Sequence, residues 1–508
     1  MTLTLDPEAI TLGQLRQIWS GADACLDDAA IRRIADTAAC VDRIVASGET
    51  VYGVNTGFGL LANTRIADDR LAELQSNLIL SHSAGIGDPL PRHVTRLMIV
   101  LKLLGLGRGY SGVRVELVEA LQALLDRGAI PVIPSQGSVG ASGDLAPLAH
   151  LGAALMGYGK IDFAGEILPA RDALRALEMK PMALGPKEGL ALINGTQAST
   201  ALALDALFAG ERIFSAAIAA GALSVDALKG SIKPFDPRVS ELRGQPGQIR
   251  VAAALRGLLH GSEIVASHAP CGKVQDPYSF RCQPQVMGAS LDLLAGAART
   301  LAIEAGAVTD NPILFGAGGD NGSDEAISGG NFHAQPVGFA ADMIAMALCE
   351  VGSLSERRSA VLIDPKMSGL PPFLVEDSGV NSGLMIPQVT AAALTSENKS
   401  LAFPASVDSI PTSAGQEDHV AMAPIAARKA GMIARNAAGV VAVELMAAAQ
   451  GVDFHAPLKT SGKLRPIHSK IRTITKGFKS DRYWADDLAA LQSAVVAGEI
   501  GAGENFLD

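Results

Sequence analysis

Aromatic side chains and cysteines are scarce in this chain of 508 residues, at 4% and five residues respectively. No two cysteines form a Cys-x-x-Cys pair, and an odd number does not suit a framework of disulfides. The sequence therefore argues against a disulfide-stapled secreted domain and predicts a protein of the reducing cytoplasm. His268-x-x-Cys271 could supply two metal ligands, but without a further set they do not predict a zinc site, and we expect no metal.

A basic run is missing as well. The formal net charge is -10, and the 42 Lys and Arg are scattered among 52 Asp and Glu, so we expect no nucleic acid and no anionic membrane as partner. Met1 to Trp19 lack the basic start and apolar core of a secretory signal, and we find no long uncharged apolar run that would span a bilayer. With 48% hydrophobic and 19% charged residues, the chain is expected to be globular and to act on a small soluble substrate.

The most specific stretch is the Gly-rich run from Gly137 to Asp144, which contains Ala141-Ser142-Gly143. If the backbone bends tightly there, the Gly143 nitrogen can attack the Ala141 carbonyl and close a five-membered ring. Loss of water at that carbonyl and from the Ser142 side chain leaves a methylidene-imidazolone, which accepts electrons as no ordinary side chain does. Gly143 suits this step because it has no Cβ to block the approach. A flexible Gly/Ser turn is the alternative interpretation.

Alanine- and leucine-rich segments predict a mainly α fold. Apolar residues recur at helical spacing on two faces, formed by Val94, Leu97, Leu101 and Leu104 and by Leu117, Leu121 and Leu124. Residues 339–358 and 420–450 are apolar around much of the helix circumference, which is typical of helices buried in a bundle, and Pro424 would fall near the start of the second. We expect an electrophile-bearing N-terminal portion, residues 1–200, and a long-helix bundle, residues 201–508.

Segments along nearly the whole chain resemble those of the aromatic amino acid lyases, which make an electrophile from their own backbone. They are residues 137–150 (GSVGASGDLAPLAH), 51–59 (VYGVNTGFG), 194–197 (NGTQ), 275–282 (QDPYSFRC), 309–312 (TDNP) and 329–334 (GGNFHA). Ser81-His82 and residues 416–419 (QEDH) resemble the imidazole-binding segments of members that act on histidine. Two positions depart from that pattern: Gln335 stands where these members tend to have Glu, and Gly415 where they tend to have Asn.

The resemblance implies a homotetramer whose active sites combine residues of several subunits. The cofactor would be 4-methylidene-imidazol-5-one, formed autocatalytically from Ala141, Ser142 and Gly143, with no external cofactor. The reaction would be the non-oxidative elimination of ammonia from L-histidine to give trans-urocanate. A tyrosine or phenylalanine ammonia-lyase or 2,3-aminomutase is the alternative, which His82 and Glu417 disfavour. An inactive helical scaffold is a third interpretation, which retention of the tripeptide together with Tyr52 and Arg281 disfavours.

The resemblance also assigns catalytic roles to single side chains. Tyr52 would take the β-proton of the substrate, although a phenol, with an ordinary pKa of about 10, must be made more acidic to act as a base. Glu417 would accept a hydrogen bond from an imidazole N–H, with His82 as a tunable second partner. Tyr278 is expected among the catalytic residues.

Other residues are expected to bind the substrate or the prosthetic ring. The planar fork of Arg281 can hold a carboxylate through two parallel hydrogen bonds, and Gln275 lies in the same segment. Asn194 can donate and accept beside the ring, and Phe332 would pack against it. Asp144, directly after the tripeptide, would assist cyclisation or cap a helix that begins near Leu145.

Overall fold

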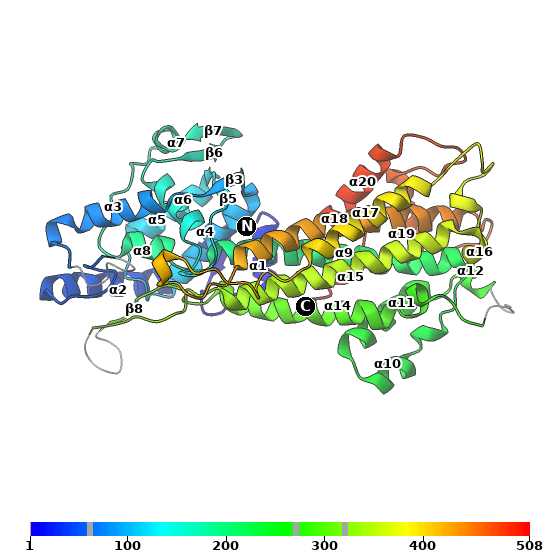
Figure 1. Ribbon diagram of the computed structural model, residues 1–508, viewed down its shortest axis with the longest axis horizontal. Coiled ribbons are helices and arrows are strands. Elements are labelled where there is room, and N and C mark those ends of the chain that lie inside the picture. The colour runs from blue at the N-terminus through cyan, green and yellow to red at the C-terminus, as the bar shows by residue number, and fades with distance from the viewer. Residues whose placement is uncertain (1, 58–64, 268–273, 317–323, 508) are drawn as a thin grey trace. The chain divides into compact units, whose positions relative to one another are not determined.

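The protein is mainly helical, as predicted (Figure 1). The structure, a computed structural model, describes residues 2–57, 65–267, 274–316 and 324–507. Backbone contacts divide the chain into two compact units, each assembled from several segments. The predicted division into residues 1–200 and 201–508 stays a prediction. Four long helices include residues of both units: α9 (Gln197–Leu228), α14 (Gln283–Ala305), α15 (Gln335–Ile363) and α18 (Ala423–Asp453).

The first unit comprises Met1–Asp205, Ala298–Ala341 and Pro404–Arg428. Its helices are α1 (Leu12–Trp19), α2 (Asp28–Ser47), α3 (Leu71–His82), α4 (Arg92–Gly107), α5 (Val115–Asp126), α6 (Leu145–Leu155), α7 (Ala170–Ala176) and α8 (Glu188–Ile193), with 3-10 turns at Asp68–Arg70 and Ser413–Gly415. Its strands form small sheets: β1 (Leu3–Leu5) beside β2 (Ala24–Leu26), β3 (Ile86–Pro89) beside β5 (Pro134–Gln136), β4 (Ile130–Pro131) with β6 (Lys160–Phe163) and β7 (Glu166–Pro169), and β8 (Ile313–Phe315) beside β9 (Glu325–Ile327).

The second unit comprises Ala206–Ala297, Asp342–Phe403 and Lys429–Asp508. Besides its parts of the long helices it contains α10 (Pro237–Arg243), α11 (Pro246–Leu259), α12 (Glu263–Ala266), α13 (Tyr278–Arg281), α16 (Pro365–Ser368), α17 (Met385–Leu401), α19 (Leu464–Ile474) and α20 (Trp484–Ala497), with 3-10 turns at Lys233–Phe235 and Pro372–Leu374.

The two helical faces predicted from spacing are buried in the first unit. Val94, Leu97, Leu101 and Leu104 of α4 are at most 2% exposed, and Leu117, Leu121 and Leu124 of α5 are fully buried. The tripeptide lies in the connection between β5 and α6. Strand β5 and helix α6 therefore hold the two ends of the segment that contains Ser142.

The helix predicted over residues 420–450 begins at Ala423. Met422 has a φ of 53°, a left-handed conformation that a right-handed helix does not allow. Pro424 falls in the first turn, where its missing N–H leaves no helical hydrogen bond unmade. Residues 420–422 are therefore connection rather than helix.

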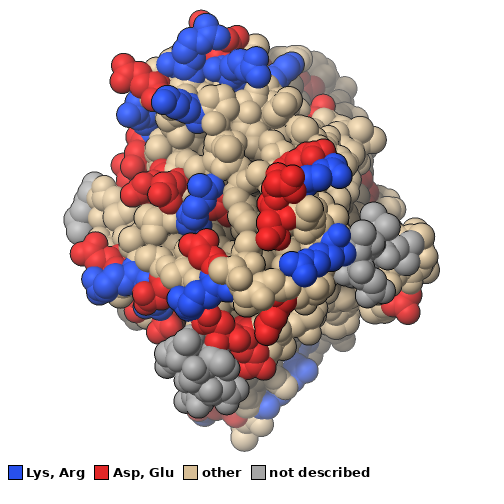
Figure 2. Space-filling view, turned by 90° about the vertical axis from the view of Figure 1, so that its left-hand side faces the viewer, with Lys and Arg blue, Asp and Glu red and all other residues tan. Residues whose placement is uncertain are grey.

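By length and composition α9, α14, α15 and α18 could cross a membrane. Their most apolar windows are, however, 83%, 44%, 67% and 78% buried inside the protein. The windows of α9, α15 and α18 therefore serve largely as core, whereas less than half of the α14 window is buried. For α15 and α18 this agrees with the prediction of helices buried in a bundle. On the face shown in Figure 2, acidic and basic side chains are interspersed rather than gathered by sign.

A fully buried ion pair joins two helices of the second unit, and a serine hydroxyl joins a third helix to it. Arg358 of α15 donates to Glu444 of α18 through Nη2 at 2.7 Å, and neither side chain is exposed. The hydroxyls of Ser224 on α9 and Ser355 on α15 donate to the two carboxylate oxygens at 2.7 and 2.6 Å. The parts of α9, α15 and α18 that carry these groups run alongside one another (Figure 1). A buried charge is tolerated only when paired and hydrogen-bonded, so this network fixes how the three helices align.

Glu444→Gln is expected to destabilise the protein because it leaves the Arg358 guanidinium buried without a counter-charge. Breaking a buried pair in this way costs about 3–5 kcal/mol, which thermal unfolding at fixed protein concentration would show as a lower Tm. The double change Arg358→Met with Glu444→Leu should recover much of the loss. Arg238→Ala, at an exposed ion pair, is the matched control and should leave Tm nearly unchanged. A Glu444→Gln protein as stable as the wild type would contradict this account.

Candidate active site

The tripeptide is held by an unusually close approach of two backbone segments. Gly143 pairs with Gly195 in a parallel bridge, and the Asp144 N–H donates to the Gly195 carbonyl at 2.7 Å. A Cβ at Gly143 would lie 2.3 Å from the Gly195 oxygen, far inside contact distance, and its φ of 77° is left-handed. Only glycine fits position 143. The sequence selected Gly143 for another reason, that no Cβ would block attack of its nitrogen on the Ala141 carbonyl, and that role stays a prediction.

Asp144 anchors the tripeptide from inside the protein. Its Oδ2 accepts from the backbone N–H and the hydroxyl of Ser199 at 2.7 and 2.9 Å, and Ser138 donates to Oδ1 at 3.3 Å. Burial raises the pKa of Asp144 to about 6, although these hydrogen bonds act in the opposite direction. Its side chain does not cap α6, so the capping role expected from the sequence is wrong.

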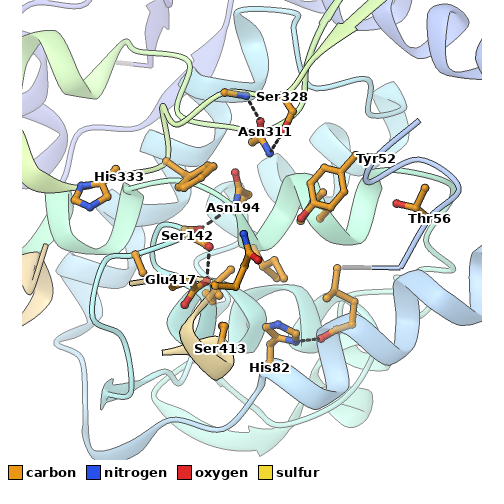
Figure 3. Close-up of a pocket in the computed structure, with 18 of the residues that line it drawn as sticks. Tyr52, Thr56, His82, Ser142, Asn194, Asn311, Ser328, His333, Ser413 and Glu417 are labelled. Carbon is orange, nitrogen blue, oxygen red and sulfur yellow. Dashed lines mark hydrogen bonds between the residues drawn. The ribbon is translucent and has the colours of Figure 1, made fainter. Parts of the chain in front are cut away.

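A cavity of about 1260 Å³ opens beside Ser142 and is lined by residues of the first unit (Figure 3). Three chain segments far apart in the sequence meet there. Seven of the residues selected from the sequence line it: Tyr52, His82, Ala141, Ser142, Asn194, Phe332 and Glu417. The phenol oxygen of Tyr52 points toward the middle of the cavity.

Asn194 aims its side chain at the tripeptide. Its Nδ2 donates to the Ser142 carbonyl oxygen at 3.0 Å, and the residue is 4% exposed. Its Oδ1 is buried and has no hydrogen-bond partner among the residues that the structure describes. The one hydrogen bond of the Asn194 side chain among the described residues is therefore the one that it donates to the Ser142 carbonyl oxygen.

Glu417 contacts the tripeptide from the third segment of the first unit, Pro404–Arg428. One carboxylate oxygen accepts the Ser142 hydroxyl, and the other accepts the Thr412 hydroxyl at 2.6 Å. Thr412 and Glu417 also exchange backbone hydrogen bonds of 2.9 and 3.3 Å. Thr412 thus closes a small loop that orients the carboxylate.

His82 ends α3 at the edge of the cavity. Its Nδ1 lies 2.8 Å from the Leu78 carbonyl oxygen, which can only accept, so Nδ1 carries the proton. In the neutral ring Nε2 is then an acceptor. The loop after His82 is attached to α6, because the Gly85 N–H donates to His150 Nε2 at 3.1 Å. Burial lowers the pKa of His150, which favours the neutral ring that can accept this hydrogen bond.

Residues 10–473 match the sequence family described as aromatic amino acid lyase. The chain belongs to this family. It is 56% identical over 492 residues to histidine ammonia-lyase of Paracidovorax citrulli, a match that covers 97% of this chain and 95% of the relative. Two solved structures are also similar along its length. Histidine ammonia-lyase from Trypanosoma cruzi has a TM-score of 0.91 at 39% identity, covering 98% of this chain and 94% of that one. Tyrosine aminomutase from Streptomyces globisporus has 0.93 at 32%, covering 98% and 97%.

One departure from the family pattern has a conformational explanation in this lyase. Ser413, Ala414 and Gly415 form a turn with three successive positive φ values of 50, 55 and 87°. Glycine and asparagine are the residues that accept this conformation most readily, so Gly415 can replace Asn without altering the turn. The other departure, Gln335, donates through Nε2 to the Ser406 carbonyl at 2.9 Å and so attaches the start of α15 to the segment that leads to Glu417.

Three residues expected in the lyase site lie elsewhere in the chain fold. Gln275, Tyr278 and Arg281 belong to the second unit and do not line the described cavity. Gln275 is exposed, Tyr278 is 74% exposed, and the Arg281 guanidinium lies 5.9 Å from the Tyr278 ring centre. Their role stays a prediction. His268, Cys271, Phe58 and Gly59 lie outside the described residues; within them, no group of three His, Cys, Asp or Glu is placed to hold a metal.

The cavity contains residues that sequence reasoning did not select. The rings of His333 and His419 stack with centres 5.8 Å apart and an angle of 8°, and His333 Nε2 lies 3.1 Å from the His419 carbonyl. Both histidines stand inside segments that resemble the family, so their position was a usable signal. Thr412 carried no such signal, because its contact with Glu417 depends on the fold of the turn.

Proposed function

We propose that this lyase eliminates ammonia from L-histidine to give trans-urocanate, that is, that it is a histidine ammonia-lyase. The observation that carries the proposal is the meeting of His82 and Glu417 with Ser142 in one cavity. An imidazole has one N–H and one acceptor nitrogen. The Glu417 carboxylate can accept from the N–H, and His82 can donate through Nε2 to the other nitrogen when its ring is protonated. The 56% identity to histidine ammonia-lyase of Paracidovorax citrulli supports the same substrate. We infer a soluble cytoplasmic enzyme.

The residues around the tripeptide fit a 4-methylidene-imidazol-5-one formed from Ala141, Ser142 and Gly143. Ring closure joins the Gly143 nitrogen to the Ala141 carbonyl carbon and releases the Ala141 oxygen as water. A second water takes the Ser142 hydroxyl and the Ser142 Cα proton. The glycine-only contact at Gly143 and the Asn194 amide on the Ser142 oxygen support this fit. Once formed, the group supplies an electrophilic carbon that accepts the electrons of the departing amine or of the imidazole ring.

The side chains of the cavity supply proton transfer and charge stabilisation. Tyr52 takes the β-proton of the substrate once its phenol is ionised. The Asn194 N–H stabilises negative charge that develops on the Ser142 oxygen, as a donor fixed in advance does in other sites of this kind. Glu417 accepts the imidazole N–H, His82 makes the second contact, and Phe332 packs beside them. The similar tyrosine aminomutase shows that the fold alone does not choose the substrate, and the His82–Glu417 pair favours histidine.

We further infer a homotetramer in which a neighbouring copy completes each site. The cavity is lined by the first unit, while Gln275, Tyr278 and Arg281 stand on the second unit, with Tyr278 largely exposed. A site that takes these residues from another copy would explain why the Tyr278 side chain is exposed and why Arg281 is only partly buried.

Subunit mixing tests the shared site. Tyr52→Phe and Tyr278→Phe should each be nearly inactive alone, and co-expression should restore about one quarter of wild-type activity. The fraction follows because half of the sites carry an intact Tyr52, and half of these meet an intact Tyr278 from another copy. The matched control is co-expression of Tyr52→Phe with Ser142→Ala. It should restore no activity, because both residues line the same cavity of one chain. Absence of recovery in the first pair would contradict the shared site.

Intact mass tests the prosthetic group. The wild type should weigh two waters less than its sequence. Ser142→Ala cannot lose the second water, and it should keep the fold because only a hydroxyl is removed. Circular dichroism and chromatography check that the variant folds. An active wild type with an unmodified mass would overturn the assignment of Ala141, Ser142 and Gly143.

Substrate choice should depend on Glu417. Glu417→Gln should lower kcat/KM for histidine about 10- to 100-fold more than any residual activity on phenylalanine, which has no ring N–H to satisfy. Thr412→Val keeps the carboxylate but removes its 2.6 Å donor, so a smaller change in the same direction is expected. Equal losses on both substrates would place Glu417 in general catalysis and would argue against its role in recognising imidazole.

A further inference from the structure

Lys102 is a buried lysine that the proposed reaction does not use. It is the one charged residue among residues 97–107 of α4, and it is 2% exposed. Burial of a lysine is costly and is tolerated when its ammonium group meets specific acceptors. The apolar sequence around it does not indicate what these acceptors are.

The acceptors lie at the end of a short helix that leads into the site. Lys102 Nζ donates to the carbonyl oxygens of Ala191 and Asn194 at 3.0 and 2.8 Å. Ala191 belongs to the last turn of α8, and Asn194 is its C-terminal cap. Carbonyls at a helix C-terminus have no partner within the helix and attract a cation. Lys102 therefore satisfies groups that the helix leaves open.

The same Asn194 carries the amide that meets the tripeptide. Its backbone N–H donates to Leu190 at 2.9 Å, and its backbone carbonyl accepts from Lys102. Its side chain donates to the Ser142 oxygen, as Figure 3 shows. With both backbone groups fixed, the amide starts from one defined position. Lys102 does not contact the Ser142 carbonyl itself: Asn194 lies between them, and Lys102 does not line the cavity.

We propose that Lys102 is a positioning residue: it holds the backbone of Asn194 so that the Asn194 amide meets the Ser142 carbonyl oxygen. This inference rests on the proposed function. Negative charge develops on that oxygen when Ser142 loses its Cα proton during maturation, and again when the substrate is activated. A donor that is displaced by a fraction of an ångström stabilises this charge less in both processes.

The surroundings of Lys102 favour this role over that of an ion pair. The nearby carboxylate of Asp310 is bound to Lys187 at 2.8 Å, and Asp144 is bound to Ser199. Burial lowers the pKa of Lys102 to about 7, with Lys187 acting in the same direction and Asp310 and Asp144 opposing it. A neutral amine has two N–H groups and an ammonium has three, so either form can donate to both carbonyls.

Lys102→Met tests the proposal because it keeps the length of the side chain and removes its donors. We expect kcat for histidine to fall about 10- to 100-fold while KM changes less than about threefold, since the donor acts mainly on the charge that develops in the reaction. Loss of the Ser142 water should also slow, so intact mass should show newly made protein one water heavier than the mature form. Leu97→Ala, a buried apolar truncation in the same helix, is the stability control and should mature at the wild-type rate.

A double variant shows whether Lys102 acts through Asn194. If it does, Lys102→Met combined with Asn194→Ala should lose no more kcat than Asn194→Ala alone. Additive losses would overturn the proposal, as would a Lys102→Met protein that matches Leu97→Ala in kcat and in water loss. Lys102→Gln replaces Lys102→Met if the latter is insoluble, and failure of both to fold would make Lys102 a residue of the core only. A wild type without water loss or urocanate formation would instead reject the proposed function.

Discussion

The close contact between Gly143 and Gly195 is the constraint on which the rest of the site depends. A Cβ at Gly143 would lie 2.3 Å from the Gly195 oxygen, whereas a Cβ at Gly195 would meet the side chains of Gln197 and Thr309, and both glycines have positive φ values. The contact places residues 141–144 directly beside residues 194–195. From there Asn194 reaches the Ser142 carbonyl, Asp144 reaches Ser199, and Lys102 holds the carbonyl of Asn194. A bulkier residue at position 143 would separate all of these groups.

The charged groups beneath the tripeptide are arranged so that few remain without a partner. Lys187 meets Asp310, Asp144 meets Ser199, and Glu304 accepts the Thr196 hydroxyl at 2.6 Å. Burial raises the pKa of Asp144 and of Glu304 and lowers that of Lys102, so each of these groups is pushed toward its neutral form. Because Asp144 and Lys102 are buried, the local dielectric constant is low, which strengthens the hydrogen bond between Asn194 and the Ser142 oxygen.

The helical fold and several residues of the site could be predicted from the sequence, because they depend on the spacing and type of residues that are close together in the chain. Helical spacing identified the buried faces of α4 and α5, and the Gly-rich run identified the tripeptide that lies beside the cavity. What escaped prediction depends on contacts between distant segments: the threonine that orients Glu417, the acceptors of Lys102, and the direction of the Asp144 side chain. The start of α18 was misplaced by three residues because nothing local indicates the left-handed conformation of Met422. The placement of Tyr278 and Arg281 remains a prediction, since it concerns more than one chain.

The contact between Ser142 and Glu417 spans 275 residues, and this separation orders events during protein synthesis. At a ribosomal rate of about 5–20 residues per second, Glu417 is made some tens of seconds after Ser142. During that interval the tripeptide belongs to a nascent chain that still lacks the residues between 413 and 419 that line part of the cavity. The complete cavity, and any chemistry that needs it, is therefore available only when translation is nearly finished.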